Sequence, residues 1–520
     1  MEEDVLIVAD GLVLTCDPDN RAGSLTLVVR AGVIVEIGED SAAIRSRYPD
    51  APVMDASGML VLPGFVNAHV HSVSLLLRDI TAGLPLSGWK ASAQLREAAG
   101  RLYSPAASGD VATVVKAAAA AQLKSGITSL AEMPAEIEAD VFRRVVSTVA
   151  DTGMRALTIV RSWDQLHAVR ELSGDGHAFA MDLGAEEDYT VYSLESRIHA
   201  AREAGIPLFA HVGETREGVE MVRRNFQKPL FHVLREFGAL HADTLCAHLN
   251  HCGEPDAQAL RDAACTLTVC AGSTMAKQTG YPFLRTLMSH DMRLAIGTDW
   301  GMFDVLAEAR LLAQLPSFIP GVPEFAAVEL VRMATINGAE TLGLGSDTGS
   351  IEPGKRADLV MLRLDDMRVP AIPRAPSAEQ IAALLVRSPH PPAVSEVLVR
   401  GVFEVHNGAL VRQDEQALLA DLRQLRERWG IEGAQPAPAA GADEIPASRS
   451  ARPKVLQLVP RDPDLSQDHP PATPAALPAQ PQERSANLST AKRRVSPKRP
   501  TIHPELPKDV RRVFGDDDEP

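Results

Sequence analysis

Cysteine is scarce in this chain: 520 residues contain only five, Cys16, Cys246, Cys252, Cys265 and Cys270. Their number is odd, and no two are separated by two residues, so neither a disulfide framework nor a zinc site built from thiolates is expected. Unpaired thiols are typical of proteins in a reducing compartment. The cysteine content therefore predicts a cytoplasmic protein.

Long apolar runs are also missing. The run "VATVVKAAAAAQL" is interrupted by Lys116 and is shorter than the roughly 18–20 residues needed to span a bilayer. The opening residues, "MEEDVLIVAD", are acidic, whereas a secretory signal begins with a basic segment. The net charge of −16 gives the chain no counterion-release advantage on a nucleic acid. We therefore expect neither a membrane nor a nucleic acid as a partner.

Aromatic residues nearly disappear from the last part of the chain. Residues 432–520 contain 16 of the 37 prolines and a single aromatic residue, Phe514. A segment rich in proline and alanine cannot bury enough apolar surface to offset the entropy lost on ordering. The composition predicts a disordered tail over 432–520. Two roles stay open for it: a solubilising tail, or a docking segment for a partner that the sequence does not identify.

Both ends of the remaining chain alternate apolar and polar residues, as half-buried strands do. This pattern is seen in "SLTLVVRAGVIVEIG" near the start and in "VSEVLVRGVFEVHNGALV" near residue 400. Two distant segments of the same character predict one small β-sandwich domain formed by residues 1–57 and 346–412. A C-terminal helix is expected over 413–431.

Between these ends, eight short apolar runs alternate with amphipathic stretches rich in alanine and arginine. Strands that alternate with helices form parallel sheets, and eight such units over residues 58–345 match the size of a (β/α)8 TIM barrel. The eight predicted strands are 58–71, 126–133, 155–161, 177–183, 206–211, 243–248, 265–270 and 292–299.

Side chains that can bind a metal stand at the ends of four of these runs. His69 and His71 end the first, His211 the fifth, His248 the sixth and Asp299 the eighth. The active site of a (β/α)8 barrel lies at the C-terminal ends of its strands, and residues i and i+2 of a strand share a face. We therefore expect His69, His71, His211 and Asp299 to bind one divalent metal ion, either zinc or iron. Taken alone, Asp299 could equally be a helix N-cap.

Two further residues complete the predicted site. Glu214 follows His211 by three residues and could transfer a proton between a metal-bound water and a substrate atom. His248 would face the same cavity and polarise the substrate or the attacking hydroxide. No lysine occurs between Ser125 and Gln227, where a carbamylated lysine bridging two metal ions would be needed. The site is therefore expected to hold a single metal ion.

At these residues the chain resembles the amidohydrolase superfamily. The matching segments are "LPGFVNAHVH", "PLSGW", "GITSLAEM", "FAHVGET", "CAHLNH", "IGTD" and "ATINGAETLGLGSDTGSIEPGKRADLVML". They are most similar to the branch of cyclic-amidine deaminases and chlorohydrolases, which includes guanine, methylthioadenosine/S-adenosylhomocysteine and triazine hydrolases. The resemblance implies the same metal ligands, with Glu214 as the proton shuttle and His248 beside the metal-bound water.

The chain departs from that branch in loops that contact substrate. Thr274, in "CAGSTMAKQTG", stands where the branch has Asn, and a short "GTDWGMFD" loop carries Trp300. The stretch "WKASAQLRE" lacks a Trp-Pro pair and puts Glu97 about one residue out of register. Trp89, Glu97 and Trp300 are candidate substrate-binding residues, although Trp89 could instead pack the barrel rim.

The expected reaction is hydrolytic deamination of a small heterocyclic substrate by a metal-bound hydroxide. Asp299 would accept the proton of the water, Glu214 would protonate the ring nitrogen, and His248 would hold the hydroxide. Hydrolysis of a cyclic amide or displacement of chloride at the same metal centre is an alternative. A non-catalytic scaffold with a partner-recruiting tail is another. Assembly into a homo-oligomer is left open.

Overall fold

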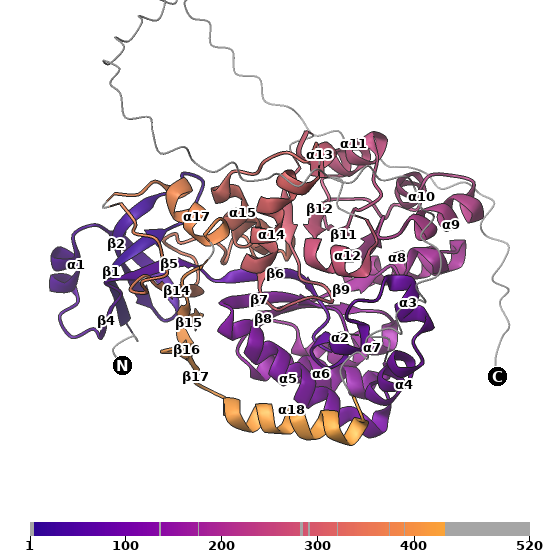
Figure 1. Cartoon of the computed structure of the whole chain (residues 1–520), viewed down its shortest axis with the longest axis horizontal. Coiled ribbons are helices and arrows are strands. Elements are labelled where there is room, and N and C mark those ends of the chain that lie inside the picture. The colour runs from indigo at the N-terminus through magenta and orange to yellow at the C-terminus, as the bar shows by residue number, and fades with distance from the viewer. Residues whose placement is uncertain are drawn as a thin grey trace, which may run out of the picture. The chain divides into compact units, whose positions relative to one another are not determined.

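The computed structural model describes residues 5–431 with the exception of residues 135–136, 175, 281–283, 290–291, 320, 374 and 389 (Figure 1). The predicted tail, residues 432–520, lies outside the described residues. Within the described part, no helix has both the length and the apolar character required to cross a membrane.

Eight parallel strands form the predicted barrel, in the order of the chain from β6 to β13. Its first and last strands meet through backbone hydrogen bonds: the His69 carbonyl accepts from the Thr298 and Asp299 amides at 2.9 and 2.8 Å. This seam closes the barrel, so the (β/α)8 fold expected from the sequence is confirmed. The strands are β6 (Phe65–Val70), β7 (Ile127–Glu132), β8 (Arg155–Val160), β9 (His177–Asp182), β10 (Leu208–Val212), β11 (Thr244–His248), β12 (Thr266–Val269) and β13 (Leu294–Ile296).

Helices cover the outside of the barrel strands (Figure 1). Their sequences have apolar residues every three to four positions, as in α6, where Val141, Val145 and Val149 are buried against the strands. The helices after the first strand are α2 (Ser74–Thr81), α3 (Leu86–Ala91), α4 (Ala93–Leu102), α5 (Ser108–Lys124), α6 (Ala139–Asp151), α7 (Trp163–Val169), α8 (Val191–Ala204), α9 (Arg216–Phe226), α10 (Leu230–Glu236), α11 (Glu254–Ala263), α12 (Ala271–Lys277), α13 (Leu284–Ser289), α14 (Val305–Phe318), α15 (Ala327–Met333) and α16 (Ile336–Thr341). Short 3-10 turns occur at η1 (Pro105–Ala107), η2 (Arg170–Leu172) and η3 (Glu186–Asp188).

A separate sheet of nine strands is built from both ends of the described chain, as the alternating patterns predicted. Most neighbouring strands are antiparallel, whereas β4 and β5 run parallel to β1. Its strands are β1 (Val5–Leu14), β2 (Ala22–Arg30), β3 (Val33–Gly38), β4 (Val53–Asp55), β5 (Met59–Pro63), β14 (Leu359–Arg363), β15 (Val394–Val399), β16 (Val402–His406) and β17 (Ala409–Leu410). Helix α1 (Ser41–Arg47) packs against β1 and β2 of this sheet, whereas α17 (Ala378–Val386), which lies between β14 and β15 in the chain, packs against α14 and α15 of the barrel.

The prediction that residues 58–71 form a single strand of the barrel is wrong. The structure divides it at Gly64 into β5, which pairs with β14 in the nine-stranded sheet, and β6, which begins the barrel. A β-carbon at Gly64 would lie only 2.3 Å from the Thr128 hydroxyl oxygen, so only glycine fits where the chain passes from one sheet to the other. Both halves are buried and apolar, and the pattern alone therefore could not show the break.

The final helix, α18 (Glu415–Trp429), lies within the range predicted for it, 413–431, and runs along the outside of α5 (Figure 1). Ion pairs join the two helices at both ends: Lys124 contacts Glu415 at 2.6 Å, and Arg428 contacts Asp110 at 2.8 Å. This helix therefore links the end of the described chain to the barrel.

Candidate metal centre

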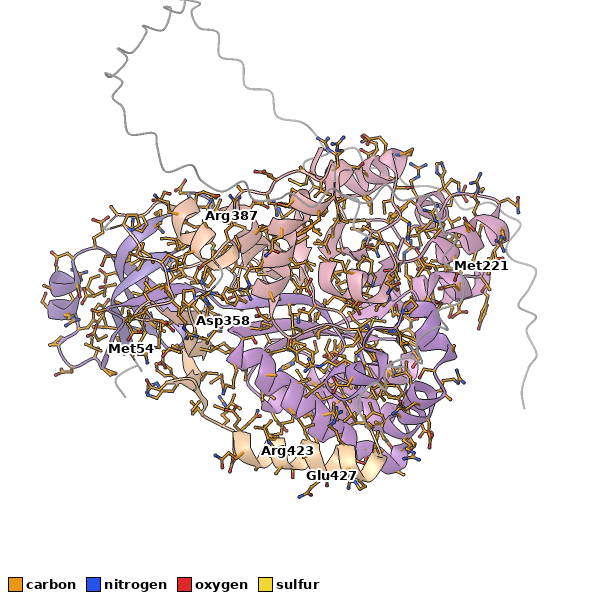
Figure 2. The ribbon with its side chains drawn as sticks, viewed as in Figure 1. Met54, Met221, Asp358, Arg387, Arg423 and Glu427 are labelled. Carbon is orange, nitrogen blue, oxygen red and sulfur yellow. The ribbon has the colours of Figure 1, made fainter. Side chains whose placement is uncertain are left out.

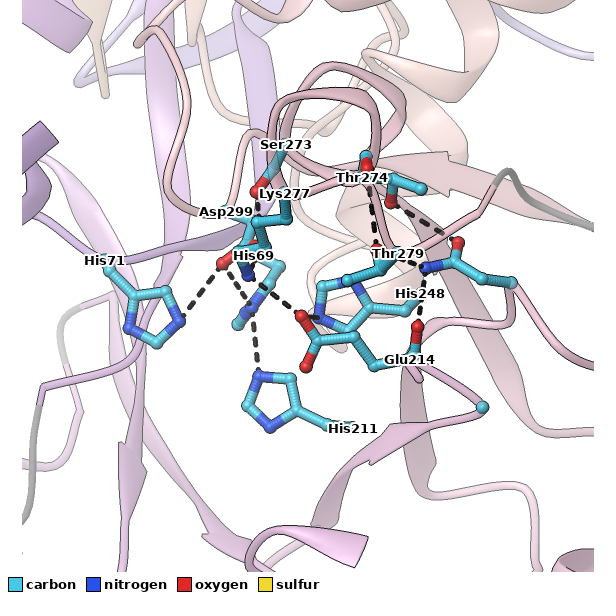
Figure 3. Close-up of polar contacts among 12 residues, drawn as sticks. His69, His71, His211, Glu214, His248, Ser273, Thr274, Lys277, Thr279 and Asp299 are labelled. Atoms are coloured by element: carbon cyan, nitrogen blue, oxygen red, sulfur yellow. Dashed lines mark hydrogen bonds and ion pairs between the residues drawn. The ribbon is translucent and has the colours of Figure 1, made fainter. Parts of the chain in front are cut away.

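The structure brings together six of the predicted site residues at the C-terminal mouth of the barrel (Figure 3). His69 lies on β6 and His71 directly after it, His211 lies on β10, His248 ends β11, and Asp299 follows β13. Glu214 lies in the loop between β10 and α9. Their positions follow from the parallel barrel, which directs the ends of all its strands to one face.

Nitrogen and oxygen atoms of this cluster face one another at short distances. His69 Nε2 lies 3.3 Å from His211 Nε2 and 3.6 Å from Asp299 Oδ1, and His71 Nε2 lies 3.2 Å from the same Asp299 oxygen. One ligand atom from each of His69, His71 and His211 lies within 4.8 Å of the others. Such a convergence of imidazoles and a carboxylate fits a single divalent metal ion.

Several buried polar atoms of the cluster have no hydrogen-bond partner among the described residues. These atoms are Asp299 Oδ1, both ring nitrogens of His248 and His69 Nδ1. Buried polar groups are almost always paired, so a cluster of unpaired nitrogen and oxygen atoms indicates a ligand that the protein atoms do not supply. His71 is oriented differently: its Nδ1 lies 2.9 Å from the Met133 carbonyl, so it donates there and leaves Nε2 as an acceptor.

Burial favours the uncharged form of three imidazoles, those of His69, His211 and His248. It lowers the pKa of His69 to about 4, with Asp299 partly opposing the effect. Burial also lowers the pKa of His248, and it moves the pKa of His211 well below its ordinary value with help from the neighbouring histidines. A neutral imidazole is the form that binds a metal, so the site needs little proton release before a cation enters.

The backbone is strained at two of these residues. His248 has φ of 79° and Asp299 has φ of 50°, a left-handed region that side chains other than glycine seldom adopt. Strain of this kind persists only where surrounding structure enforces it, and it clusters at functional sites. At Asp299 the seam with β6 enforces it, because the Asp299 carbonyl also accepts the His71 amide at 3.2 Å.

The loop that carries Glu214 is anchored by hydrogen bonds to residues of two neighbouring segments. The Gly213 amide donates to Glu186 at 2.5 Å, and the Asn250 side chain donates to the Glu214 carbonyl at 3.1 Å. Its carboxylate lies 3.9 Å from His248 Nε2. Burial is the largest single effect and would raise the pKa of Glu214, but the charge and hydrogen bond of Lys277, together with the neighbouring His248, lower it.

Lys277 and Ser273 are site residues that sequence reasoning missed. Both belong to α12, and both contact Asp299 Oδ2: the Ser273 hydroxyl at 2.6 Å and the Lys277 ammonium at 2.5 Å. A signal was present, since both lie in the stretch "CAGSTMAKQTG" that departs from the resembled branch. Thr274, from the same stretch, contacts Asn250 at 3.3 Å rather than the clustered histidines.

The three candidate substrate-binding residues divide into two groups. Trp89 and Trp300 pack together with ring centres 5.4 Å apart, and the Trp300 ring lies 5.9 Å from that of His71. The prediction that Glu97 binds substrate is corrected by the structure. Glu97 lies on α4, its side chain is 65% exposed, and it pairs with Arg101 one turn away. The one-residue shift in register therefore leaves this acid on the outer surface.

A cavity of about 360 Å³ opens beside the cluster. It is lined by the start of α3, the loop after β10 and the end of α12, including Leu86, Thr215, Lys277 and Thr279. A larger depression of about 680 Å³ lies between α7 and α8 and includes none of the clustered residues. The smaller cavity is the one next to the clustered site residues, and its size suits a small molecule.

The sequence matches a model described as the Amidohydrolase family over residues 60–403. The chain is 28% identical over 437 residues to a 5-methylthioadenosine/S-adenosylhomocysteine deaminase of Pelotomaculum thermopropionicum, which covers 80% of this chain and 96% of that protein. It is 26% identical over 453 residues to a 5'-deoxyadenosine deaminase of Methanosarcina acetivorans, covering 81% and 98% of the two chains.

Solved structures share the fold. An adenosine deaminase from Xanthomonas campestris with bound zinc superposes with a TM-score of 0.73 at 23% identity, covering 82% of this chain and 99% of that one. Atrazine chlorohydrolase from Arthrobacter aurescens, complexed with zinc, gives a TM-score of 0.71 at 20% identity and covers 81% and 99%. At these identities the likeness establishes the barrel and its accompanying sheet.

Proposed function

The chain belongs to the amidohydrolase family, and from that membership we propose that it is a metal-dependent hydrolase that deaminates an aminated heterocycle. The observation that carries the proposal is the convergence of three histidines and a buried aspartate beside a glutamate at the barrel mouth. Deaminases are named among its relatives.

A divalent metal ion is held by His69, His71, His211 and Asp299 in this proposal, and the ion is zinc. Support comes from their facing nitrogen and oxygen atoms and from the zinc present in two of the similar solved structures. When bound, the metal ion acidifies water and polarises the substrate carbon that is to be hydrolysed.

The side chains of the site would divide the proton transfers. Asp299 takes one proton from the attacking water and later passes it to the leaving amine. Glu214 takes the other proton of the water and delivers it to the ring nitrogen next to the reacting carbon, which becomes tetrahedral as the water oxygen adds. His248, 3.9 Å from Glu214, holds the incoming oxygen. The carbon–nitrogen bond then breaks and ammonia leaves.

The substrate is a small heterocycle with an exocyclic amine. Trp89 and Trp300 stand beside the cluster and offer aromatic faces on which a flat ring could stack. The cavity lined by α3 and α12 gives it access. A cytoplasmic location agrees with the five cysteines, which are buried and free of disulfides within the described residues.

Replacing Glu214 with glutamine tests its role in proton transfer. The Glu214→Gln variant should retain stoichiometric metal and lose at least about 100-fold in kcat, since general acid–base catalysis contributes 10²- to 10⁴-fold. Metal content by mass spectrometry and turnover by ammonia release measure both effects. Exposed Glu97 provides the control, and Glu97→Gln should behave as the unmodified enzyme does. Retained turnover in Glu214→Gln would remove this residue from the mechanism.

A screen for ammonia release tests the reaction itself. Zinc-loaded protein should release ammonia from at least one member of a panel of aminopurines, adenosine derivatives, aminopyrimidines, aminotriazines and pterins. Chloride release from chlorotriazines and ring opening of cyclic amides are measured in parallel. Activity only in the parallel assays would replace deamination with one of the other hydrolytic reactions.

A further inference from the structure

Lys277 is a buried cation placed beside the proposed metal centre. It lies at the end of α12, its side chain is 8% exposed, and its ammonium contacts Asp299 at 2.5 Å and Glu214 at 3.0 Å. The same ammonium lies 5.6 Å from the centre of the Trp89 ring. Figure 3 shows the lysine reaching between the two carboxylates. A lysine is seldom buried unless it is paired, and here both partners are carboxylates of the site.

The two oxygens of Asp299 have different surroundings. Oδ1 faces His69 and His71 and accepts no hydrogen bond among the described residues. Oδ2 accepts hydrogen bonds from Ser273 and Lys277. The oxygen left for a metal ion is therefore Oδ1, while α12 holds the other oxygen.

The neighbouring carboxylates need a positive charge when no metal ion is bound. Asp299 is fully buried, and the side chain of Glu214 is only 20% exposed, so water screens their repulsion poorly. Lys277 contacts both. Once a divalent ion binds to Oδ1, the same lysine lies close to a second positive charge across a single carboxylate, and that arrangement costs energy.

We propose that Lys277 is an internal counter-cation, which neutralises Asp299 and Glu214 in the metal-free protein and opposes binding of the metal ion. This inference rests on the proposed function, because it takes the cluster to be a metal site. Lys277 is thus a positioning residue: it fixes the free oxygen of Asp299, orients Glu214 and limits the affinity for the metal.

The variant Lys277→Met tests the proposal by direct measurement of zinc affinity. Methionine keeps much of the length and apolar volume of the side chain and removes the charge. Zinc affinity, measured by competition with a chromophoric chelator, should rise at least about tenfold. The matched control is Ser273→Ala, which removes a neutral donor to the same oxygen. Because loss of an ordinary outer partner weakens metal affinity about 10- to 100-fold, the two variants should shift in opposite directions.

Thermal unfolding provides a second measurement that does not depend on catalysis. Without metal, Lys277→Met should unfold at a lower temperature than the unmodified protein, because two buried carboxylates are left facing each other. Adding zinc should raise its unfolding temperature by more than it raises that of the unmodified protein. Lys277→Gln carries the same expectations and replaces the methionine variant if that one does not fold.

The outcomes separate this inference from the proposed function. Unchanged or weaker zinc affinity in the neutral lysine variants, with normal binding by the unmodified protein, would overturn the counter-cation role alone. An unmodified protein that binds no divalent metal would overturn the proposed function and, with it, this inference.

Discussion

His71 shows how single atoms prepare the site. Its Nδ1 donates to the Met133 carbonyl at the end of β7, so Nε2 is left as an acceptor facing Asp299. Its neighbour His69 is completely buried and stacks against Phe209, with ring centres 5.1 Å apart. Both rings are therefore fixed by the barrel before any ligand binds, which lowers the entropy cost of binding a metal.

Removal of His211 should abolish tight metal binding. The variant His211→Ala loses one of three imidazoles that face one another, so its zinc affinity should fall at least about 100-fold, more than the loss of an outer partner usually costs. The matched control is His241→Ala, because His241 lies in a loop and its side chain is 40% exposed. Chelator competition measures both. Equal zinc affinity in the two variants would show that His211 is not a ligand.

The sequence was informative about residues at strand ends, but it did not single out Lys277 on α12. Two alternating histidines, a third histidine and an aspartate each follow an apolar run, and the barrel geometry then requires them to meet. Lys277 belongs to no such pattern, since its contact with Asp299 depends on how the short helix after β12 turns back over the mouth. Glu97 had the right residue type but the wrong helix face.

At the scale of elements, Gly297 lets β13 approach β6 closely. A β-carbon there would lie 2.8 Å from His69 Cβ and 2.9 Å from the His69 amide nitrogen. The variant Gly297→Ala should therefore be destabilised by about 1–3 kcal/mol and should bind zinc more weakly, because His69 must move. A β-carbon at Gly23 in β2 would have no atom within 4 Å, so Gly23→Ala is the control. Denaturant unfolding and chelator competition measure the two effects.

Glu308 couples α14 to α12 and gives stability a dependence on pH. Its carboxyl accepts the Gly272 amide at 2.7 Å, and burial raises its pKa from 4.5 to about 8. Between these values the folded protein keeps a proton that the unfolded chain has lost, so stability contributed by this group is present below pH 4.5 and is lost as the pH rises to about 8.

The variant Glu308→Gln should remove that dependence, since glutamine does not titrate. As the pH rises from 4.5 to 8, the unfolding temperature of the unmodified protein should therefore fall relative to that of the variant. Thermal unfolding at several pH values measures this difference, with Glu97→Gln as an exposed control. A difference that stays constant with pH would show that Glu308 is ionised in the folded protein.

Element boundaries were predictable wherever turns separated unlike patterns. The strands from β7 to β13 lie within or close to their predicted ranges because a helix follows each apolar run. The prediction of one strand over 58–71 was wrong because β5 and β6 are consecutive buried strands of two different sheets, joined by one glycine. Burial on both faces removes the alternation that would have distinguished them.

For the whole molecule, a buried ion pair ties the barrel to the nine-stranded sheet. Asp358, labelled in Figure 2, immediately precedes β14 and contacts Arg155, the first residue of β8, at 2.5 Å. Arg155 also contacts Asp347 at 2.7 Å. Asp358 is completely buried and also accepts the Arg400 amide at 2.6 Å. The two sheets therefore share a charged contact from which water is excluded.

Loss of this pair should destabilise the protein strongly. The variant Arg155→Met leaves Asp358 buried without its cation, which should cost about 3–5 kcal/mol of unfolding free energy. The control is Arg293→Met, because Arg293 pairs with Glu340 at the surface, where such a pair contributes about 1 kcal/mol or less. Denaturant unfolding compares the variants. Equal losses would mean that the pair between the sheets contributes no more than a surface pair.

The contact between β6 and β13 also determines when, during synthesis, the two sides of the site can meet. Asn67 donates to Thr298 across 231 positions of the chain, next to His69 and Asp299. A ribosome adding about 5–20 residues per second needs roughly 10–50 s to pass from one side of the seam to the other. Throughout that interval the nascent chain contains its first two histidines without Asp299, so the proposed metal site is complete only after nearly all of the barrel has been made.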